Sequence, residues 1–221
     1  MTADELVVLL SPDGRAIGTA LKAAVHHAAT PLHLAFSAYL FNDRGELLLT
    51  QRALDKATFP GVWTNSVCGH PAPGEHLADA VRRRAADELG LVVRDLRLVL
   101  PRFAYRAEMG DIVEWEMCPV LVGHVDEDPR PNSDEVAETA WADWDEFSSD
   151  VLAGRRQISS WSREQVVQLT GLGPDPDRWP TANSADLPPA LPPALLDARR
   201  GPTGGQPARL DGQIRSTQVG H

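Results

Sequence analysis

The chain has 221 residues, of which 43% are hydrophobic and 24% are charged, and it carries a formal net charge of -10. This length suits one domain of ~150 to 200 residues with an appendage, and it is too short for two large domains. The acidic balance argues against nucleic acid or an anionic membrane as a partner, because both need a basic protein face.

The first residues and the cysteines predict the cellular compartment in which the protein is found. No stretch approaches the ~18 to 20 consecutive apolar residues of a membrane span, and the first residues lack the features of a signal peptide. Two cysteines, Cys68 and Cys118, are too few for a disulfide framework and are expected to be free thiols. We therefore expect a soluble, cytoplasmic protein with no nucleic-acid or membrane partner.

Strand-like and helix-like segments alternate over the first 170 residues. An apolar run at 6–10 ends in a turn at 11–14, and residues 18–29 predict a helix that ends before Pro31. The remaining expected elements are strands at 34–41 and 46–50 joined by a hairpin turn at 42–45, a helix at 76–89 that ends at Gly90, strands at 96–105, 112–125 and 140–144, and a helix at 162–170. This interleaving predicts an α+β or α/β sandwich with a mixed sheet.

The composition changes near residue 170. Nine of the 18 prolines lie in residues 171–221, and this segment has almost no apolar periodicity. Such a segment is not expected to bury enough apolar surface to offset its ordering entropy. The sequence therefore predicts a domain at 1–170 and a disordered Pro/Gly-rich tail at 171–221. Five Arg and five Asp cancel within the tail, so the net negative charge belongs to the domain.

The helix at 76–89 belongs to a spaced set of glycines and charges. The set fits G-x5-E-x7-R-x4-E-x-G-L, running from Gly69 through Glu75, Arg83 and Glu88 to Gly90. This spacing resembles a Nudix box, which presents carboxylates to metals on a diphosphate, but Arg84 and Asp87 stand where hydrolases of that family have glutamates. A guanidinium at 84 suits a phosphate oxygen better than a second metal. An ion pair between Arg84 and Glu88 on a solvated helix face is the alternative.

Two short stretches project reactive side chains to one side of an extended chain. Cys68 and His70 are two residues apart and leave the same face, next to the expected helix. Glu114 and Glu116 also share a face, where adjacent carboxylates repel unless a cation or proton lies between them. A core cysteine and a solvent-facing strand edge are the alternatives.

Several histidines could complete a metal site. Two imidazoles from the N-terminal region, together with the groups just described, would supply three nitrogens and two carboxylates: His26, His33, His70, Glu114 and Glu116. A mixed set of this kind suits a five- or six-coordinate divalent metal such as Mn²⁺ or Zn²⁺. The spacing of the histidines does not by itself form a ligand motif.

Four stretches closely resemble the type I isopentenyl-diphosphate isomerases, a family with the Nudix fold. They are residues 32–37, 51–56, 59–71 and Ser160-Trp161, and the string Trp-Thr-Asn-Ser-Val-Cys-Gly-His-Pro at 63–71 is highly specific. The resemblance covers roughly residues 5 to 170 and implies an α+β fold, a Nudix-type α/β/α sandwich with a mixed β-sheet. The proline-rich tail falls outside it.

The resemblance implies a role for each candidate residue. Cys68 and Glu116 would act on opposite faces of the substrate, with Tyr105 hydrogen-bonded near the glutamate. One divalent metal, Mn²⁺, Zn²⁺ or Mg²⁺, would be bound by the three histidines and two glutamates His26, His33, His70, Glu114 and Glu116. A Mg²⁺ on the diphosphate would use Glu88. The substrate would be held by Lys22, Arg52, Lys56, Arg84 and Trp161.

These implications predict a metal-dependent isomerase of isoprenoid biosynthesis that interconverts isopentenyl diphosphate and dimethylallyl diphosphate through a tertiary carbocation. The chemistry needs an acid, a base and a pocket without water, and the π face of Trp161 suits the cation. We expect a monomer whose partner is this small-molecule substrate. A Nudix pyrophosphohydrolase is the first alternative, but it needs the carboxylates missing at 84 and 87. A catalytically silent Nudix domain, the second, has no use for Cys68, Tyr105 and Glu116 together.

Overall fold

The structure, a computed structural model, describes residues 5–192 and contains two mixed β-sheets. The larger sheet has the strand order β12-β5-β4-β11-β8, with two short strands, β6 and β7, pairing with β5 and β4. Its strands are β4 (Phe36–Phe41), β5 (Glu46–Arg52), β6 (Trp63–Thr64), β7 (Val67–Gly69), β8 (Arg94–Leu100), β11 (Val120–His124) and β12 (Val136–Asp143). The central pair, β4 and β11, is parallel, and the pairs around it are antiparallel.

The smaller sheet has the order β2-β1-β3-β10-β9. Its strands are β1 (Leu6–Leu10), β2 (Ala16–Leu21), β3 (His33–Leu34), β9 (Ala104–Met109) and β10 (Ile112–Met117). β3 pairs with β10 in parallel, with His33 opposite Glu116. This register places an imidazole beside a carboxylate from a strand about 80 positions later in the chain.

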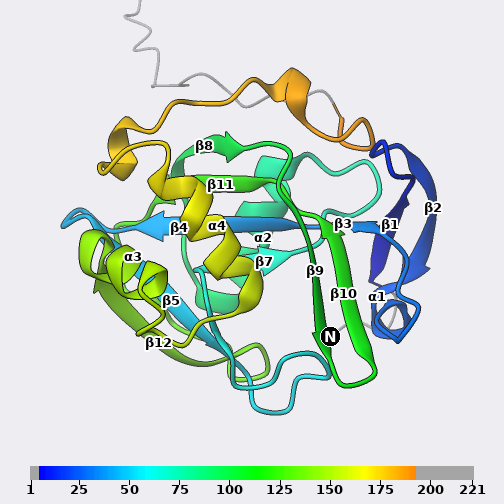
Figure 1. Cartoon of the computed structure of the whole chain (residues 1–221), viewed down its shortest axis with the longest axis horizontal. Coiled ribbons are helices and arrows are strands. Elements are labelled where there is room, and N and C mark those ends of the chain that lie inside the picture. The colour runs from blue at the N-terminus through cyan, green and yellow to red at the C-terminus, as the bar shows by residue number, and fades with distance from the viewer. Residues whose placement is uncertain (1–4, 193–221) are drawn as a thin grey trace, which may run out of the picture.

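Helices cover both faces of the larger sheet (Figure 1). The side chains of β4 alternate, so that Phe36, Ala38 and Leu40 pack with α2 (Leu77–Leu89) in one apolar cluster. Tyr39 and Phe41 pack on the opposite face with α3 (Trp144–Leu152) and α4 (Ser160–Thr170). A strand that is apolar on both faces must be covered on both, and burying each such side chain contributes about 1.5–3 kcal/mol. The α/β/α sandwich expected from the sequence is confirmed.

The N-terminal helix prediction is wrong. Residues 18–29 form most of β2 followed only by the short helix α1 (Lys22–Val25). β2 pairs along its length with β1, from Leu6 opposite Leu21 to Leu10 opposite Ala16. Alanine is a strong helix former, but intrinsic propensity is small compared with tertiary interactions, and the pairing of β2 with β1 overrides it.

Two long predicted strands are each divided between the sheets. The stretch at 96–105 turns after Leu100 and forms parts of β8 and β9, and the stretch at 112–125 passes from β10 to β11 around Pro119. Proline has no amide hydrogen for a ladder, so both changes of sheet occur where a proline follows the first strand. The sequence analysis missed α3, whose first turn is capped by the side chain of Asp143.

Residues 171–192 differ from the predicted tail, because they pack against the domain. They contain two 3₁₀ turns, η1 (Pro176–Arg178) and η2 (Ser184–Asp186), and they bury Trp179, Leu187 and Leu191. These three isolated side chains join the two apolar clusters without any periodicity, so the sequence pattern did not predict their burial. The rest of the predicted tail, 193–221, lies outside the described residues. Within the described chain, none of the helices has the length and apolar character of a membrane span.

Candidate active site

A pocket of about 330 Å³ opens beside the Nudix-like helix α2, and side chains of both sheets line it. All of the predicted site residues line this pocket except His33, which lies fully buried behind it. The segments that supply them are α1, the end of β5 with the loop after it, β7, α2, β9, β10 and α4. The fold thus gathers into one cavity residues that are spread over most of the domain.

Three imidazoles and one carboxylate converge at one wall of the pocket. The ring centroids of His26, His33 and His70 are separated by 5.1, 5.2 and 5.9 Å. One nitrogen of each ring and one oxygen of Glu116 all lie within 4.8 Å of one another. Glu116 Oε1 is 3.1 Å from His70 Nε2 and 3.3 Å from His33 Nε2. Glu114, the fifth predicted ligand, lies in the same pocket but outside this cluster.

The donor atoms of this cluster suit a divalent metal. Among the described residues, the buried Nε2 atom of His26 has no hydrogen-bond partner, and the Nε2 atom of His33 faces only Glu116. Burial lowers the pKa of His26 to about 3 and also lowers the pKa of His70, which keeps both rings neutral with a free lone pair. Neutral imidazoles with a carboxylate are typical ligands of divalent metals, so the four residues fit such an ion.

Tyr105 connects the two strand glutamates. Its Oη lies 2.8 Å from Glu116 Oε2 and 3.1 Å from Glu114 Oε2, so one hydroxyl hydrogen serves two carboxylates. Burial, together with the charge of Glu116, raises the pKa of Glu114. Burial acts in the same direction on Glu116, but the hydrogen bonds of His33 and His70 hold its pKa well below the usual range. The two neighbouring carboxylates therefore differ in proton affinity, as acid–base chemistry requires.

The thiol of Cys68 is held in a fixed hydrogen-bond network. Asn65 donates both amide hydrogens to the carbonyl oxygens of Ala38 and Val67, at 3.0 Å each. Its Oδ1 consequently faces Cys68 and accepts the thiol hydrogen, with 3.2 Å between Sγ and Oδ1. Burial raises the pKa of Cys68 to about 11, so at neutral pH the group is a thiol in this structure.

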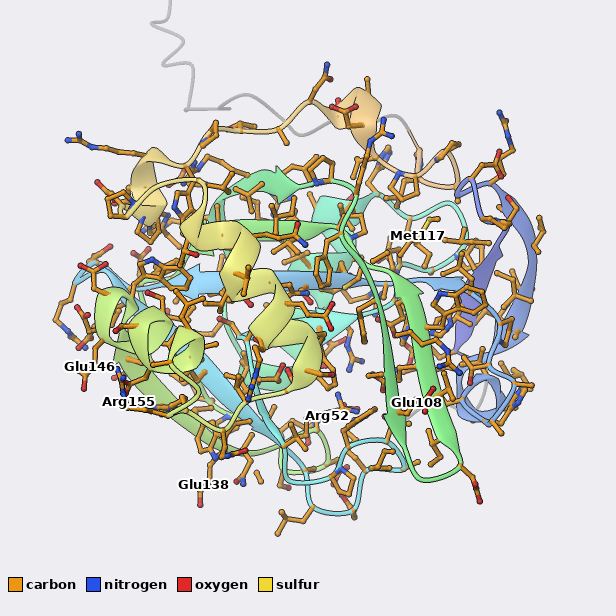
Figure 2. All side chains as sticks on the ribbon, viewed as in Figure 1. Arg52, Glu108, Met117, Glu138, Glu146 and Arg155 are labelled. Carbon is orange, nitrogen blue, oxygen red and sulfur yellow. The ribbon has the colours of Figure 1, made fainter. Side chains whose placement is uncertain are left out.

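An aromatic wall closes the apolar end of the pocket. Trp161 is buried, its Nε1 donates to Thr64 Oγ1 at 2.9 Å, and its ring lies 5.6 Å from the ring of Tyr105. The guanidinium carbon of Arg52 lies 6.0 Å from the tryptophan ring centroid. Figure 2 labels Arg52 at the end of β5, where its Nη2 donates to Thr58 Oγ1 at 2.8 Å. The tryptophan thus has one fixed orientation with its face near the catalytic candidates.

The basic end of the pocket contains paired charges. Lys22 forms an ion pair with Glu5 at 2.9 Å, and Lys56 forms one with Glu135. Arg84 pairs with Glu88 and also contacts Glu135 at 3.2 Å. The ion pair of Arg84 and Glu88 that the sequence analysis kept as an alternative therefore exists, but it is buried and lines the pocket.

The loop before α2 brings the strand and the helix into close contact. A Cβ atom at Gly69 would lie 3.0 Å from Arg84 Cγ and 3.2 Å from Phe36, so a larger residue would push the helix away. Arg83 holds Glu75 through two bonds of 2.8 Å, which fixes the loop to the helix. Asp87 is exposed on the helix surface. These contacts position Arg84 and Glu88 toward the cavity.

The comparison with known proteins identifies the family. Residues 31–162 match the family model described as NUDIX domain. A Saccharopolyspora erythraea protein named isopentenyl-diphosphate Delta-isomerase is 61% identical, over 84% of this chain and 96% of its own. The chain belongs to this isomerase family, within the NUDIX superfamily. Proteins of the same name from Mycolicibacterium vanbaalenii and Rhizobium rhizogenes are 56% and 48% identical, over 76% and 84% of this chain and 93% and 90% of theirs.

Solved structures agree on the fold. A protein of Deinococcus radiodurans has a TM-score of 0.57 at 21% identity and covers 74% of this chain and 98% of its own. The MutT protein from Methanosarcina mazei Go1 has a TM-score of 0.51 at 22% identity, covering 64% and 94%. At this identity the similarity extends to the Nudix fold of the isomerase family and not to its chemistry.

The sequence analysis missed several residues that line the pocket or contact its lining residues. Glu5 and Glu135 hold the basic side chains, and Asn65 and Ser37 hold the thiol of Cys68. Asn65 lies within the specific string at 63–71, and this string was the only feature of the sequence that could have indicated its role. Glu5 and Glu135 lie far along the chain from their partners, and the sequence contains no pattern that pairs them.

Proposed function

We propose that this protein interconverts isopentenyl diphosphate and dimethylallyl diphosphate, and that Cys68 and Glu116 carry the proton transfers. The observation that supports this most directly is the convergence of the Cys68 thiol and the Tyr105-bonded carboxylates on one pocket with a basic end. The names of the similar proteins point to the same reaction. A phosphohydrolase would need no thiol at this place.

The reaction moves a double bond by adding one proton and removing another. Cys68, a thiol in this structure, and Glu116, bonded to the Tyr105 hydroxyl, are the two groups that exchange protons with the alkene. Positioned acid–base groups typically contribute about 10²- to 10⁴-fold to a rate. The tertiary cation formed between the two transfers would lie near Trp161, whose π face favours positive charge and whose ring lies 5.6 Å from that of Tyr105.

We propose two divalent metals. The first, Mn²⁺, Zn²⁺ or Mg²⁺, would be held by His26, His33, His70 and Glu116, with Glu114 as a fifth ligand. When bound, it supplies positive charge that fixes the orientation of the Glu116 carboxylate. The second, Mg²⁺, would be held by Glu88 together with the diphosphate. Lys22, Arg52, Lys56 and Arg84 bind the phosphate oxygens.

The pocket also explains why the diphosphate stays intact. Hydrolysis by a Nudix box needs carboxylates that position metal and water at the phosphate. Arg84 occupies one of these positions, is buried, and pairs with Glu88, while the side chain at the other position, Asp87, points to solvent. We further propose that the enzyme acts as a cytoplasmic monomer without nucleic-acid partners. The net charge of -10 supports the last of these, because a polyanion binds to a basic protein face.

The test is a coupled assay with isopentenyl diphosphate, Mg²⁺ and Mn²⁺ that follows dimethylallyl diphosphate and released phosphate or pyrophosphate together. We expect isomer formation without phosphate release, and a loss of at least about 10²-fold in kcat for Cys68→Ala. The matched control is Cys118→Ala, which removes the other, fully buried thiol outside the pocket. Phosphate release from nucleoside diphosphates that is indifferent to Cys68→Ala would refute the isomerase and favour a hydrolase.

A further inference from the structure

Glu135 is a carboxylate inside the basic end of the pocket. It lies in the chain between β11 and β12, and its side chain is only 10% exposed. One oxygen atom, Oε2, contacts both Lys56 Nζ and Arg84 Nη2. A single oxygen between two cationic side chains has the surroundings that a phosphate oxygen would have in the same place.

The backbone around Glu135 is anchored on both sides. Its amide donates to the carbonyl of Asn132 at 2.9 Å, and its carbonyl accepts from the amide of Ala53 at 3.0 Å. The next residue, Val136, begins β12 opposite Arg52. Burial alone would raise the pKa of Glu135, but the hydrogen bond from Lys56 and the charge of Arg84 lower it. The carboxylate is therefore ionised at neutral pH and held at the pocket wall.

The charges of this end do not suffice for a diphosphate. Four cations, Lys22, Arg52, Lys56 and Arg84, line the pocket together with five carboxylates, Glu5, Glu88, Glu114, Glu116 and Glu135, so the cationic charge is largely offset by the protein's own carboxylates. A diphosphate ester carries about three negative charges at neutral pH. Moreover, Lys56 and Arg84 already donate to Glu135, so a phosphate oxygen must compete for the same hydrogens.

We propose that Glu135 is an internal competitor of the diphosphate, a positioning residue that holds Lys56 and Arg84 and makes anion binding depend on a co-bound divalent cation. The inference rests on the proposed function only in taking this end of the pocket as the diphosphate site. A divalent cation adds two positive charges beside the diphosphate, which reduces the repulsion between the anion and the carboxylates of the pocket. Without the cation, the carboxylate at 135 repels the anion and retains its two partners.

The experiment measures the affinity of the full chain for inorganic pyrophosphate by calorimetry, in chelator and in Mg²⁺. Glu135→Gln keeps the shape of the side chain and removes its charge. We expect it to bind pyrophosphate about tenfold tighter than the wild type in chelator, because a nearby repulsive charge is lost. We also expect Mg²⁺ to increase the affinity for pyrophosphate less in Glu135→Gln than in the wild type.

Glu138→Gln is the matched control. Glu138 lies on β12 three residues away, its side chain points outward (Figure 2), and within residues 5–192 it forms no ion pair. The Glu138→Gln variant has the same change in net charge as Glu135→Gln, and we expect it to bind pyrophosphate in chelator with the affinity of the wild type. A tightening equal to that of Glu135→Gln would overturn the proposal, because it would reflect overall charge.

Two further results bear on the proposal. Unchanged or weaker binding by a folded Glu135→Gln would overturn it. Glu135→Asp, which keeps the charge, should retain the Mg²⁺ dependence of the wild type, and its loss would also overturn the proposal. If pyrophosphate binds as expected while the wild type forms no dimethylallyl diphosphate, the isomerase function fails and the role of Glu135 is supported.

Discussion

At the residue scale, Tyr105 determines how two buried carboxylates share one pocket. Both Glu114 and Glu116 are only 5% exposed, and two carboxylates on one strand face repel each other. The single hydroxyl of Tyr105 reaches both, while the histidines contact only Glu116. The tyrosine is thus a shared hydrogen-bond donor, and removing it leaves one side of the Glu116 carboxylate without a partner.

We expect Tyr105→Phe to lower kcat by about 10- to 100-fold with little change in KM, because a hydrogen bond to a charged group is worth about 1.5–3 kcal/mol. Steady-state kinetics with isopentenyl diphosphate would measure both constants. Tyr39→Phe is the control, since it removes a buried hydroxyl that bonds Ser162 and Gln165 outside the pocket. It should lower Tm and leave kcat within about twofold. Equal losses of kcat in both variants would contradict a role for Tyr105 in proton transfer.

At the element scale, α2 is held at both ends so that its buried face stays against the pocket. Its C-terminus ends at Gly90, whose φ of 65° is left-handed and favours glycine. Before its N-terminus, Glu75 accepts two bonds from Arg83 and one from the amide of Ala72 at 2.8 Å. The Nudix-like glycine and glutamate positions therefore have a structural task here in addition to any chemistry.

Glu75 makes the stability of the protein depend on pH. Burial opposes ionisation, but Arg83 and the Ala72 amide lower its pKa below the ordinary 4.5. A lowered folded-state pKa contributes stability above 4.5, and this contribution is lost as the pH falls through the folded value. Glu75→Gln should reduce the free energy of unfolding by about 1 kcal/mol at neutral pH, a modest figure because solvent screens the pair.

Urea unfolding of the wild type and Glu75→Gln across this pH range tests the sign. The difference in the free energy of unfolding between the wild type and Glu75→Gln should decrease toward zero in acid. Asp79→Asn on the same helix is the comparison, because Asp79 is 63% exposed and its contact with Arg82 is 3.4 Å. Asp79→Asn should reduce the free energy of unfolding at neutral pH less than Glu75→Gln does. A Glu75→Gln difference that grows in acid would contradict the assignment.

At the scale of the whole molecule, residues 171–192 join the two ends of the domain. In Figure 1 this segment runs from α4 past β8 toward β1 and β2. The amide of Ala182 donates to Leu98 at 2.8 Å, and the amide of Ala190 donates to Gly14 at 2.9 Å. Trp179, 2% exposed, packs on Trp144 with 5.1 Å between ring centroids. The segment therefore completes both apolar clusters.

Truncation tests this boundary. We propose that the domain ends at residue 192, so a chain of residues 1–192 should keep the Tm and the activity of the full chain. A chain that ends at residue 170 loses Trp179, Leu187 and Leu191 from the core and should be destabilised by more than about 3–5 kcal/mol, the value for removing one large aromatic side chain. Trp179→Ala in the full chain measures the contribution of Trp179, the largest of these three side chains, to the free energy of unfolding. Equal thermal stability of both truncations would place the boundary at 170 instead.

The sequence by itself determined the features that are written locally or as a family signature. The helix at 76–89, the hairpin at 42–45 and the layered fold follow from periodicity and turn residues, and the string at 63–71 pointed to the isomerase family. These features can be predicted from the sequence because a helix, a turn and a motif each depend on residues a few positions apart.

Only the tertiary structure decided which distant residues meet. It divided two predicted strands between sheets, paired Glu135 with Lys56 across 79 positions, and packed Trp179 into the core. It also set the protonation of Cys68, because the proton affinity of a thiol depends on burial and on neighbours such as Asn65. Strand pairing, ion pairs and desolvation are governed by distance in space, which a linear pattern does not encode.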